Sequence, residues 1–209
     1  MNLATARRIA REISLVLAPA CARLEIAGSL RRAQPEVGDI ELVSIPRPAR
    51  PVFGQMSTNA LALLTLDLRS RERLLPRLDR NGREAWGRKY LRGLWQADDG
   101  GRYPLDLFIT TPDRWGVIFA LRTGSAEFSH RLVTPQEYGG AMPTCMSCRD
   151  GRLWTVPHAE AQKDEETALD TPEELDVFAA LNLPWIEPCH RSGDHLRHVL
   201  QTARMSTDI

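Results

Sequence analysis

An aspartate stands in the middle of a strongly apolar run, and this one charge constrains the fold more than any other feature. Residues 105–109 read Leu-Asp-Leu-Phe-Ile, inside a segment over 103–110 that predicts a strand. A buried carboxylate is costly unless it is paired with a positive group or bound to a cation. The fold must therefore bring a partner to Asp106, either an arginine such as Arg102 or a metal ion.

Two more carboxylates occur at strand spacing earlier in the chain. The segment over 39–45 predicts a strand, and its alternation places Asp39 and Glu41 on one face. Three converging carboxylates repel one another unless a hard divalent cation lies among them, and oxygen ligands favour Mg²⁺ or Mn²⁺. Upstream, Gly28-Ser29 followed by an arginine pair offers a cradle for a triphosphate. Each piece taken alone is equally typical of an ordinary turn or a solvated strand face.

The spacing of these residues resembles the nucleotidyltransferase signature of the DNA polymerase X family, the polymerase-β-like enzymes. That signature has Gly-Ser, an arginine pair and then Gly-Asp-x-Asp ten residues after the first glycine, and here Gly38 follows Gly28 by that distance. Asp106 resembles the family's third catalytic aspartate, on a following strand. The later matching elements are Thr123-Gly124-Ser125 with Phe128, and the segment 171–191. The similarity thus covers nearly the whole chain, roughly residues 5–191.

The resemblance implies an α/β (α+β) fold, a nucleotidyltransferase palm with a mixed sheet flanked by helices over residues 1–133. A small acidic thumb-like subdomain is expected over residues 134–209. It further implies that Asp39, Glu41 and Asp106 are the catalytic residues and hold two Mg²⁺ ions, with Mn²⁺ as a substitute. The residues that it assigns to nucleotide binding are Gly28, Ser29, Arg32, Gly38, Thr123, Gly124 and Ser125.

The implied activity is Mg²⁺-dependent addition of deoxynucleotides to a primer 3′-hydroxyl, as by a polymerase-β-like DNA polymerase in DNA repair. The implied partners are a DNA primer-template, or another nucleic-acid 3′ end, and a nucleoside triphosphate. One alternative is a template-independent terminal or nucleotidylating transferase. The other is a non-catalytic nucleic-acid-binding palm module. Whether an accessory protein supplies further grip on DNA is open.

Three departures from the family pattern bear on the expected activity. Glu41 stands where the family usually has aspartate, so its carboxylate reaches one methylene further and the metal geometry can differ. Leu121-Arg122 stands where the family has an aromatic pair that discriminates the sugar, which leaves the choice between deoxy- and ribonucleotides open. The sequence shows no helix-hairpin-helix pattern or lysine-bearing lyase segment upstream, so we expect lyase activity and the grip on downstream DNA to be missing.

The composition is that of a folded protein with an uneven distribution of charge. Residues 1–125 carry 20 Lys and Arg against 13 Asp and Glu, a net +7, and residues 126–209 carry 7 against 14, a net −7. A polyanion is therefore expected to bind the first part, although chance clustering on solvated helices, or pairing of the two parts between chains, would give the same pattern. No apolar run is long enough to cross a bilayer or resembles a signal peptide, so we expect a cytoplasmic protein with no membrane partner.

Other chemistry-bearing residues admit two readings. Cys145-x-x-Cys148 is half of a zinc motif, but the sequence has no second Cys-x-x-Cys, so we expect no structural zinc. The segment 83–97 interleaves aromatic and basic residues, which suits either base stacking or a sheet core. The arginines over 69–80 suit either backbone phosphates or a solvated face. The residues that could complete a zinc site are His158, Cys189 and His190.

The remaining periodicity predicts the other elements. We expect helices over 4–19, 57–79, 114–122, 126–133 and from 172 onward, where Pro172 takes the first helical position, and a last helix in the final fifteen residues. Further strands are expected over 23–27 and as a pair or ribbon over 83–97, and a hairpin over 144–157 that turns at Asp150-Gly151.

Overall fold

The chain folds into two compact units, Met1–Thr111 and Pro112–Ile209. The structure is a computed structural model and describes residues 1–49, 59–155 and 166–205. The compact units divide earlier in the chain than the expected palm and thumb, whose boundary after residue 133 stays a prediction. We refer to the two parts as the N-terminal unit and the C-terminal unit.

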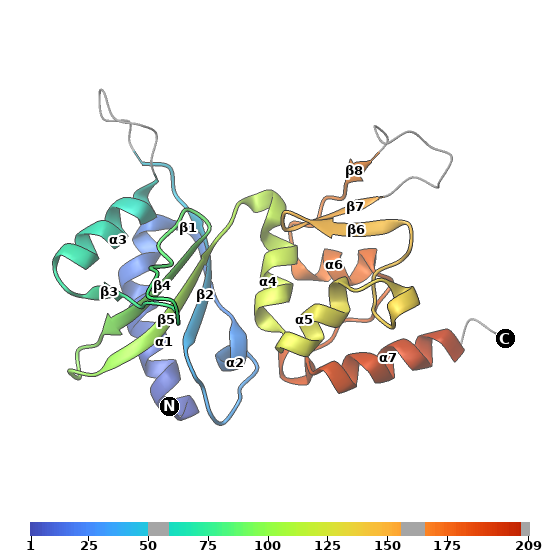
Figure 1. Cartoon of the computed structure of the whole chain (residues 1–209), viewed down its shortest axis with the longest axis horizontal. Coiled ribbons are helices and arrows are strands. Elements are labelled where there is room, and N and C mark those ends of the chain that lie inside the picture. The colour runs from blue at the N-terminus through green and yellow to red at the C-terminus, as the bar shows by residue number, and fades with distance from the viewer. Residues whose placement is uncertain (50–58, 156–165, 206–209) are drawn as a thin grey trace. The chain divides into compact units, whose positions relative to one another are not determined.

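The N-terminal unit is built on a mixed five-stranded sheet (Figure 1). The strands, in sheet order, are β1 (Cys21–Ile26), β2 (Ile40–Pro46), β5 (Arg102–Ile109), β4 (Tyr90–Gln96) and β3 (Leu74–Pro76). The central pair β2 and β5 is parallel, and the other neighbours are antiparallel. With helices packed against it, this sheet confirms the expected α+β fold class with a mixed sheet.

The helices of this unit cover one face of the sheet. They are α1 (Leu3–Leu17), the 3₁₀ turn η1 (Ala18–Ala20), the short α2 (Gly28–Arg31) and α3 (Ala60–Ser70). Asn2 caps α1 by accepting a hydrogen bond from the Thr5 amide at 2.9 Å. The buried stripe of α1 packs in one apolar core with α3 and with alternate residues of the central strands, such as Leu42 of β2 and Leu107 of β5. The residues between them on each strand consequently point to the opposite face.

The expected helix over 57–79 is wrong in its second half. Residues 57 and 58 lie outside the described residues, α3 ends at Ser70, and β3 follows at Leu74–Pro76. Glu72 takes a left-handed conformation with φ of 56°, which a helix cannot continue. Leu75, which falls within the expected helix, instead lies opposite Leu94 of β4. The apolar residues of this segment therefore belong to two elements, the helix α3 and the edge strand β3.

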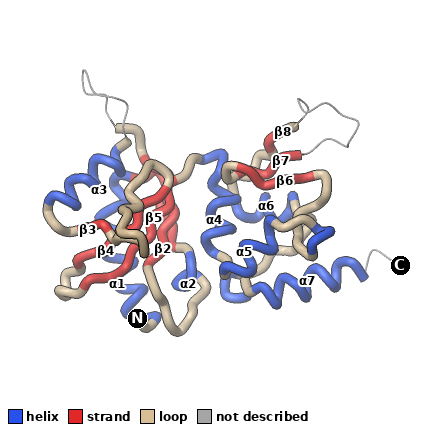
Figure 2. Tube along the Cα trace, viewed as in Figure 1, coloured by secondary structure: helices blue, strands red, loops and turns tan. Residues whose placement is uncertain are grey.

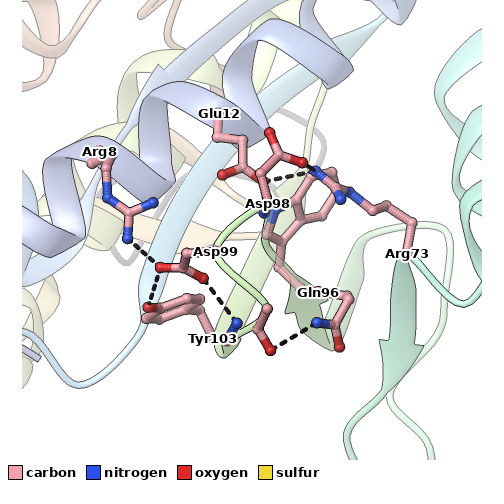
Figure 3. Close-up of polar contacts among 10 residues, drawn as sticks. Arg8, Glu12, Arg73, Gln96, Asp98, Asp99 and Tyr103 are labelled. Carbon is pink, nitrogen blue, oxygen red and sulfur yellow. Dashed lines mark hydrogen bonds and ion pairs between the residues drawn. The ribbon is translucent and has the colours of Figure 1, made fainter.

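A polar cluster ties the turn between β4 and β5 to α1 (Figure 3). Glu12 on α1 accepts hydrogen bonds at 2.8 Å from the Trp95 indole and at 2.8 Å from Arg73, and at 3.2 Å from the Asp98 amide. Beside it, Asp99 accepts from the Tyr103 hydroxyl at 2.8 Å. These bonds fix where the β4–β5 hairpin turns, and hence which of its residues lie opposite each other.

The C-terminal unit packs helices beside a small antiparallel sheet (Figure 2). Its helices are α4 (Trp115–Thr123), α5 (Ala126–Val133), α6 (Glu174–Ala180) and α7 (Gly193–Met205), with 3₁₀ turns η2 (Pro112–Arg114), η3 (Gln136–Tyr138) and η5 (Pro188–His190). The sheet has the order β6 (Met146–Arg149), β7 (Arg152–Thr155), β8 (Thr167–Ala168). The expected hairpin is confirmed, and Asp150 and Gly151 at its turn both have positive φ, 50° and 74°.

Candidate active site

The three predicted carboxylates lie at the two central strands of the N-terminal unit. Glu41 on β2 lies directly opposite Asp106 on β5 in the parallel register, and Asp39 immediately precedes β2. Because Leu42 and Leu105 point into the helix-covered core, Glu41 and Asp106 share the other face of the sheet. The fold thus brings together the backbone positions of the residues that the sequence analysis singled out.

Asp106 is bound by an arginine that the sequence analysis did not assign to it. Arg92 on β4 lies opposite Asp106 on β5, and its Nε and Nη2 donate to Oδ1 at 3.2 Å and to Oδ2 at 3.4 Å. Arg92 Nε also contacts the Tyr90 hydroxyl at 2.9 Å, and the Tyr90 ring stacks on Phe108 at 5.0 Å. The Asp106 side chain is only 8% exposed. The partner that its burial demands is therefore Arg92, and not Arg102, which bonds to Gln96.

Glu41 packs directly over the glycine that opens the Gly-Ser element. A Cβ built on Gly28 would lie 1.7 Å from Glu41 Oε2, and Gly28 has φ of 63°. The Ala27 amide also donates to the Glu41 carbonyl at 2.8 Å, so backbone and side chain both join this turn to β2. Glycine is required here for its backbone conformation and for the space that the longer glutamate occupies.

The electrostatics of the site are those of crowded carboxylates. Burial first, and then the negative charge of Asp106, raise the pKa of Asp39, while Arg77 and Arg92 act in the opposite direction. Burial, and then the same Asp106 charge, raise the pKa of Tyr90 to about 12. Asp39 and Asp106 are therefore close enough to repel each other, which is a condition that a bound cation relieves.

The Gly-Ser element also carries a half-buried arginine. Burial lowers the pKa of Arg32, and the nearby charge of Glu41 opposes that effect. Ser29, at the start of α2, is partly buried, and Gly38 is exposed with open space where a Cβ would be. A guanidinium, a hydroxyl and an exposed backbone thus flank the carboxylates, as a polyanion site requires.

The donor chemistry at the carboxylates fits a hard divalent cation. The donors are carboxylate oxygens, and the parallel register sets the backbones of Glu41 and Asp106 side by side. In the side-chain arrangement over residues 1–49, 59–155 and 166–205, no three Asp, Glu, His or Cys groups gather as metal ligands. At this site, Arg92 donates to both oxygens of Asp106, and Glu41 Oε2 lies against Gly28.

Comparison with known proteins gives a clear result for the fold. No protein-family profile matches the sequence, and no curated protein sequence matches it. Among solved structures, the chain is similar to the crystal structure of Leishmania infantum polymerase beta in a ternary P/T complex. The TM-score is 0.62 at 16% sequence identity, over 92% of this chain and 76% of that one. The fold is similar to that of polymerase beta.

The Thr-Gly-Ser element joins two helices of the C-terminal unit. Thr123 ends α4 and is fully buried, and Ser125 caps α5 by accepting from the Phe128 amide at 3.1 Å. A Cβ on Gly124 would lie 2.4 Å from the Phe128 ring. The Ser125 amide donates to the Arg191 carbonyl at 3.2 Å, which links this element to the closing segment. These contacts explain the residue types structurally, and a role in nucleotide binding stays a prediction.

Aromatic residues of the segment 83–97 pack in the core of the N-terminal unit, and two arginines of the segment 69–80 form ion pairs. Trp95 is fully buried in the core, and Trp86 packs against it beneath the Arg69 guanidinium, 5.1 Å from the ring. Arg69 bonds to Glu84 at 3.0 Å and 3.1 Å, and Arg73 to Glu12 as described above. The sheet-core reading is therefore the one that fits the segment 83–97, and these two arginines pair with carboxylates.

The cysteine motif stays a prediction about zinc. Cys145 is exposed, Cys148 is partly buried on β6, and both are free thiols. Cys189 and His190 lie in η5, and His158 lies outside the described residues.

In the described ranges, no helix has the length and apolar character that crossing a bilayer requires.

Proposed function

We propose that this chain is a Mg²⁺-dependent DNA nucleotidyltransferase that adds deoxynucleotides to a primer 3′-hydroxyl. The observation that carries the proposal is the register of the parallel strands, which sets Glu41 opposite Asp106 with Asp39 at the start of β2. The similarity of the fold to polymerase beta supports it. The proposed partners are a DNA primer-template and a deoxynucleoside triphosphate, and Mn²⁺ is a possible substitute ion.

In this proposal Asp39, Glu41 and Asp106 are the catalytic and metal-holding carboxylates. Bound Mg²⁺ would supply Lewis-acid activation of the attacking hydroxyl and charge neutralisation on the triphosphate. Asp106, buried in β5, orients the hydroxyl and accepts its proton as the new oxygen–phosphorus bond forms. Pyrophosphate leaves with the electron pair of the bond that breaks, so that atoms and charge balance.

Other residues of the chain hold the nucleotide in this proposal. Arg32 and Ser29 contact the triphosphate oxygens by charge-assisted and neutral hydrogen bonds, and the backbone at Gly28 and Gly38 allows close approach. The Thr123-Gly124-Ser125 element shapes the sugar and base side. The palm is assigned to residues 1–133 and the thumb-like subdomain to residues 134–209.

Primer extension with one nucleotide at a time tests the proposal. A gapped duplex, a recessed end and a single strand are each incubated with Mg²⁺ and one deoxynucleotide, with Asp39→Ala as the inactive control. Incorporation of the complementary nucleotide alone, lost in Asp39→Ala, is the expected result. Untemplated addition would replace the proposal by a terminal transferase, and DNA binding without any addition would replace it by a binding module.

A further inference from the structure

Asp106 is held from β4 by a two-point contact that engages both of its oxygens. Arg92 faces it directly across the antiparallel ladder, where opposite charges attract at short range. The bonds from Nε at 3.2 Å and from Nη2 at 3.4 Å are longer than the 2.7–2.9 Å typical of strong charge-assisted pairs. The contact therefore neutralises the carboxylate through hydrogen bonds that are longer than those of the tightest ion pairs.

The arginine is itself held in place from behind. Its Nε is shared with the Tyr90 hydroxyl at 2.9 Å, and Tyr90 is fixed by stacking on Phe108. The Arg92 side chain is 34% exposed, so water and ions reach it, while Asp106 is nearly closed off. Arg92 thus has two neighbours, the stacked ring of Tyr90 and the buried carboxylate of Asp106.

We propose that Arg92 is a positioning residue that holds the Asp106 carboxylate until a divalent cation takes over its charge. The inference rests on the proposed function, because it concerns the same carboxylates. A cation that binds Asp106 must draw at least one oxygen away from the guanidinium. Arg92 therefore sets the metal concentration at which the site loads, and on release it stays beside Tyr90 as a positive group facing the carboxylates.

Removing the guanidinium has two opposite consequences. Without metal, Asp106 becomes a buried carboxylate among other carboxylates, so the N-terminal unit loses stability. With metal, the cation no longer competes with a fixed positive charge and binds more tightly. A residue that served the fold alone would show the first effect and not the second.

Manganese titration measures the second effect without reference to catalysis. Free Mn²⁺ is followed by electron paramagnetic resonance during titration of the whole chain, as wild type, Arg92→Gln and Arg92→Lys. Arg92→Gln is expected to bind Mn²⁺ at least about fivefold more tightly, the order expected for one screened charge. Arg69→Gln, which removes the same charge from an exposed pair with Glu84, is the matched control and is expected to bind as wild type does.

A second pair of variants shows whether the effect runs through Asp106. In an Asp106→Asn background, the further change Arg92→Gln is expected to leave Mn²⁺ affinity unaltered, and a persisting gain would overturn the proposal. If Arg92→Gln does not fold without metal, Arg92→Lys carries the test, because a lysine cannot make both contacts. Its Mn²⁺ affinity is then expected to rise, and an affinity equal to that of wild type would overturn the proposal.

The titration separates the two proposals. A wild-type chain that binds no Mn²⁺ would contradict the proposed metal-dependent function itself. A wild-type chain that binds Mn²⁺ as tightly as Arg92→Gln does would leave that function standing and refute the role given to Arg92.

Discussion

Each compact unit buries a carboxylate beside an arginine, and the two pairs are built differently. In the C-terminal unit, Arg191 donates to Glu174 at 2.5 Å and to the Ile186 carbonyl at 3.0 Å, and its side chain is fully buried. Its guanidinium lies 5.0 Å from the Phe178 ring and 4.8 Å from the Trp185 ring. In the N-terminal unit, the contact of Arg92 with Asp106 is longer and Arg92 is open to solvent.

The difference separates a pair that holds a fold from a pair that can change partners. Arg191 is enclosed by aromatic rings and cannot leave Glu174 without unfolding its surroundings. Arg92 is 34% exposed, and we expect that its side chain can move away from Asp106 while its backbone stays in β4. We expect the first pair to affect stability and the second to affect metal binding and chemistry, and the following variants test that division.

The largest effect on stability is expected for Arg191→Met. This change leaves Glu174 buried without its partner, which costs about 3–5 kcal/mol, whereas Arg92→Gln is expected to cost about 1 kcal/mol because the Arg92 side chain is 34% exposed and its contacts with Asp106 are longer. Urea unfolding followed by tryptophan fluorescence measures both. The double variant Glu174→Leu/Arg191→Met should recover much of the loss. Equal costs for the two single arginine variants would remove the distinction between the pairs.

A smaller effect is expected for Gly28→Ala in the N-terminal unit. The positive φ costs a non-glycine residue about 1–2 kcal/mol, and the new methyl group displaces the Glu41 carboxylate. Gly38→Ala is the matched control, since open space surrounds that position. Glu41→Asp shortens the side chain, so the cost of Gly28→Ala should fall in that background.

Glu41→Asp alone should retain or raise transfer activity. A complete loss of activity in Glu41→Asp would show that the site is built differently from that of the family.

How far the sequence predicts this site depends on the length of chain between the residues. The Asp98–Gly101 turn fixes the hairpin so that Gln96 lies opposite Arg102, and counting back along both strands sets Arg92 opposite Asp106. That partner could have been found from the sequence. The parallel register of Glu41 with Asp106 could not, because the long connection between their strands does not fix it. Only the resemblance to known polymerases predicted that these residues belong to one site.

In the C-terminal unit, the sequence predicted element bounds well where capping or turn-forming residues mark them. The helix over 126–133 has the expected bounds, because Ser125 is a strong N-cap, and the hairpin turns at Asp150-Gly151 as expected.

In the N-terminal unit, the prediction of one helix over 57–79 was wrong in its second half. Its leucines fit a helical pattern, but the short strand β3 is specified by its pairing with β4. Tertiary contacts override local periodicity in such edge strands.

The smallest effect is expected for Asp39→Asn and depends on pH. Since the folded state raises the pKa of Asp39, the folded chain holds its proton more tightly than the unfolded chain. Stability contributed by this group is therefore lost as pH rises from the ordinary aspartate range through the raised pKa. Asparagine does not ionise, so the variant should melt about 1–2 °C higher than wild type near pH 7. The difference should vanish near pH 3, and a variant that melts lower than wild type near pH 7 would contradict the crowding of the carboxylates.

The central claim is that Asp106 belongs to a nucleotidyl-transfer site, and pyrophosphate release tests it most directly. Release from a deoxynucleoside triphosphate is measured with Mg²⁺ and a recessed primer-template for wild type, Asp106→Asn and the exposed control Glu84→Gln. We expect release in step with primer extension, a loss of about 10³-fold in Asp106→Asn, and no change in Glu84→Gln. Release by Asp106→Asn at the wild-type rate would contradict it.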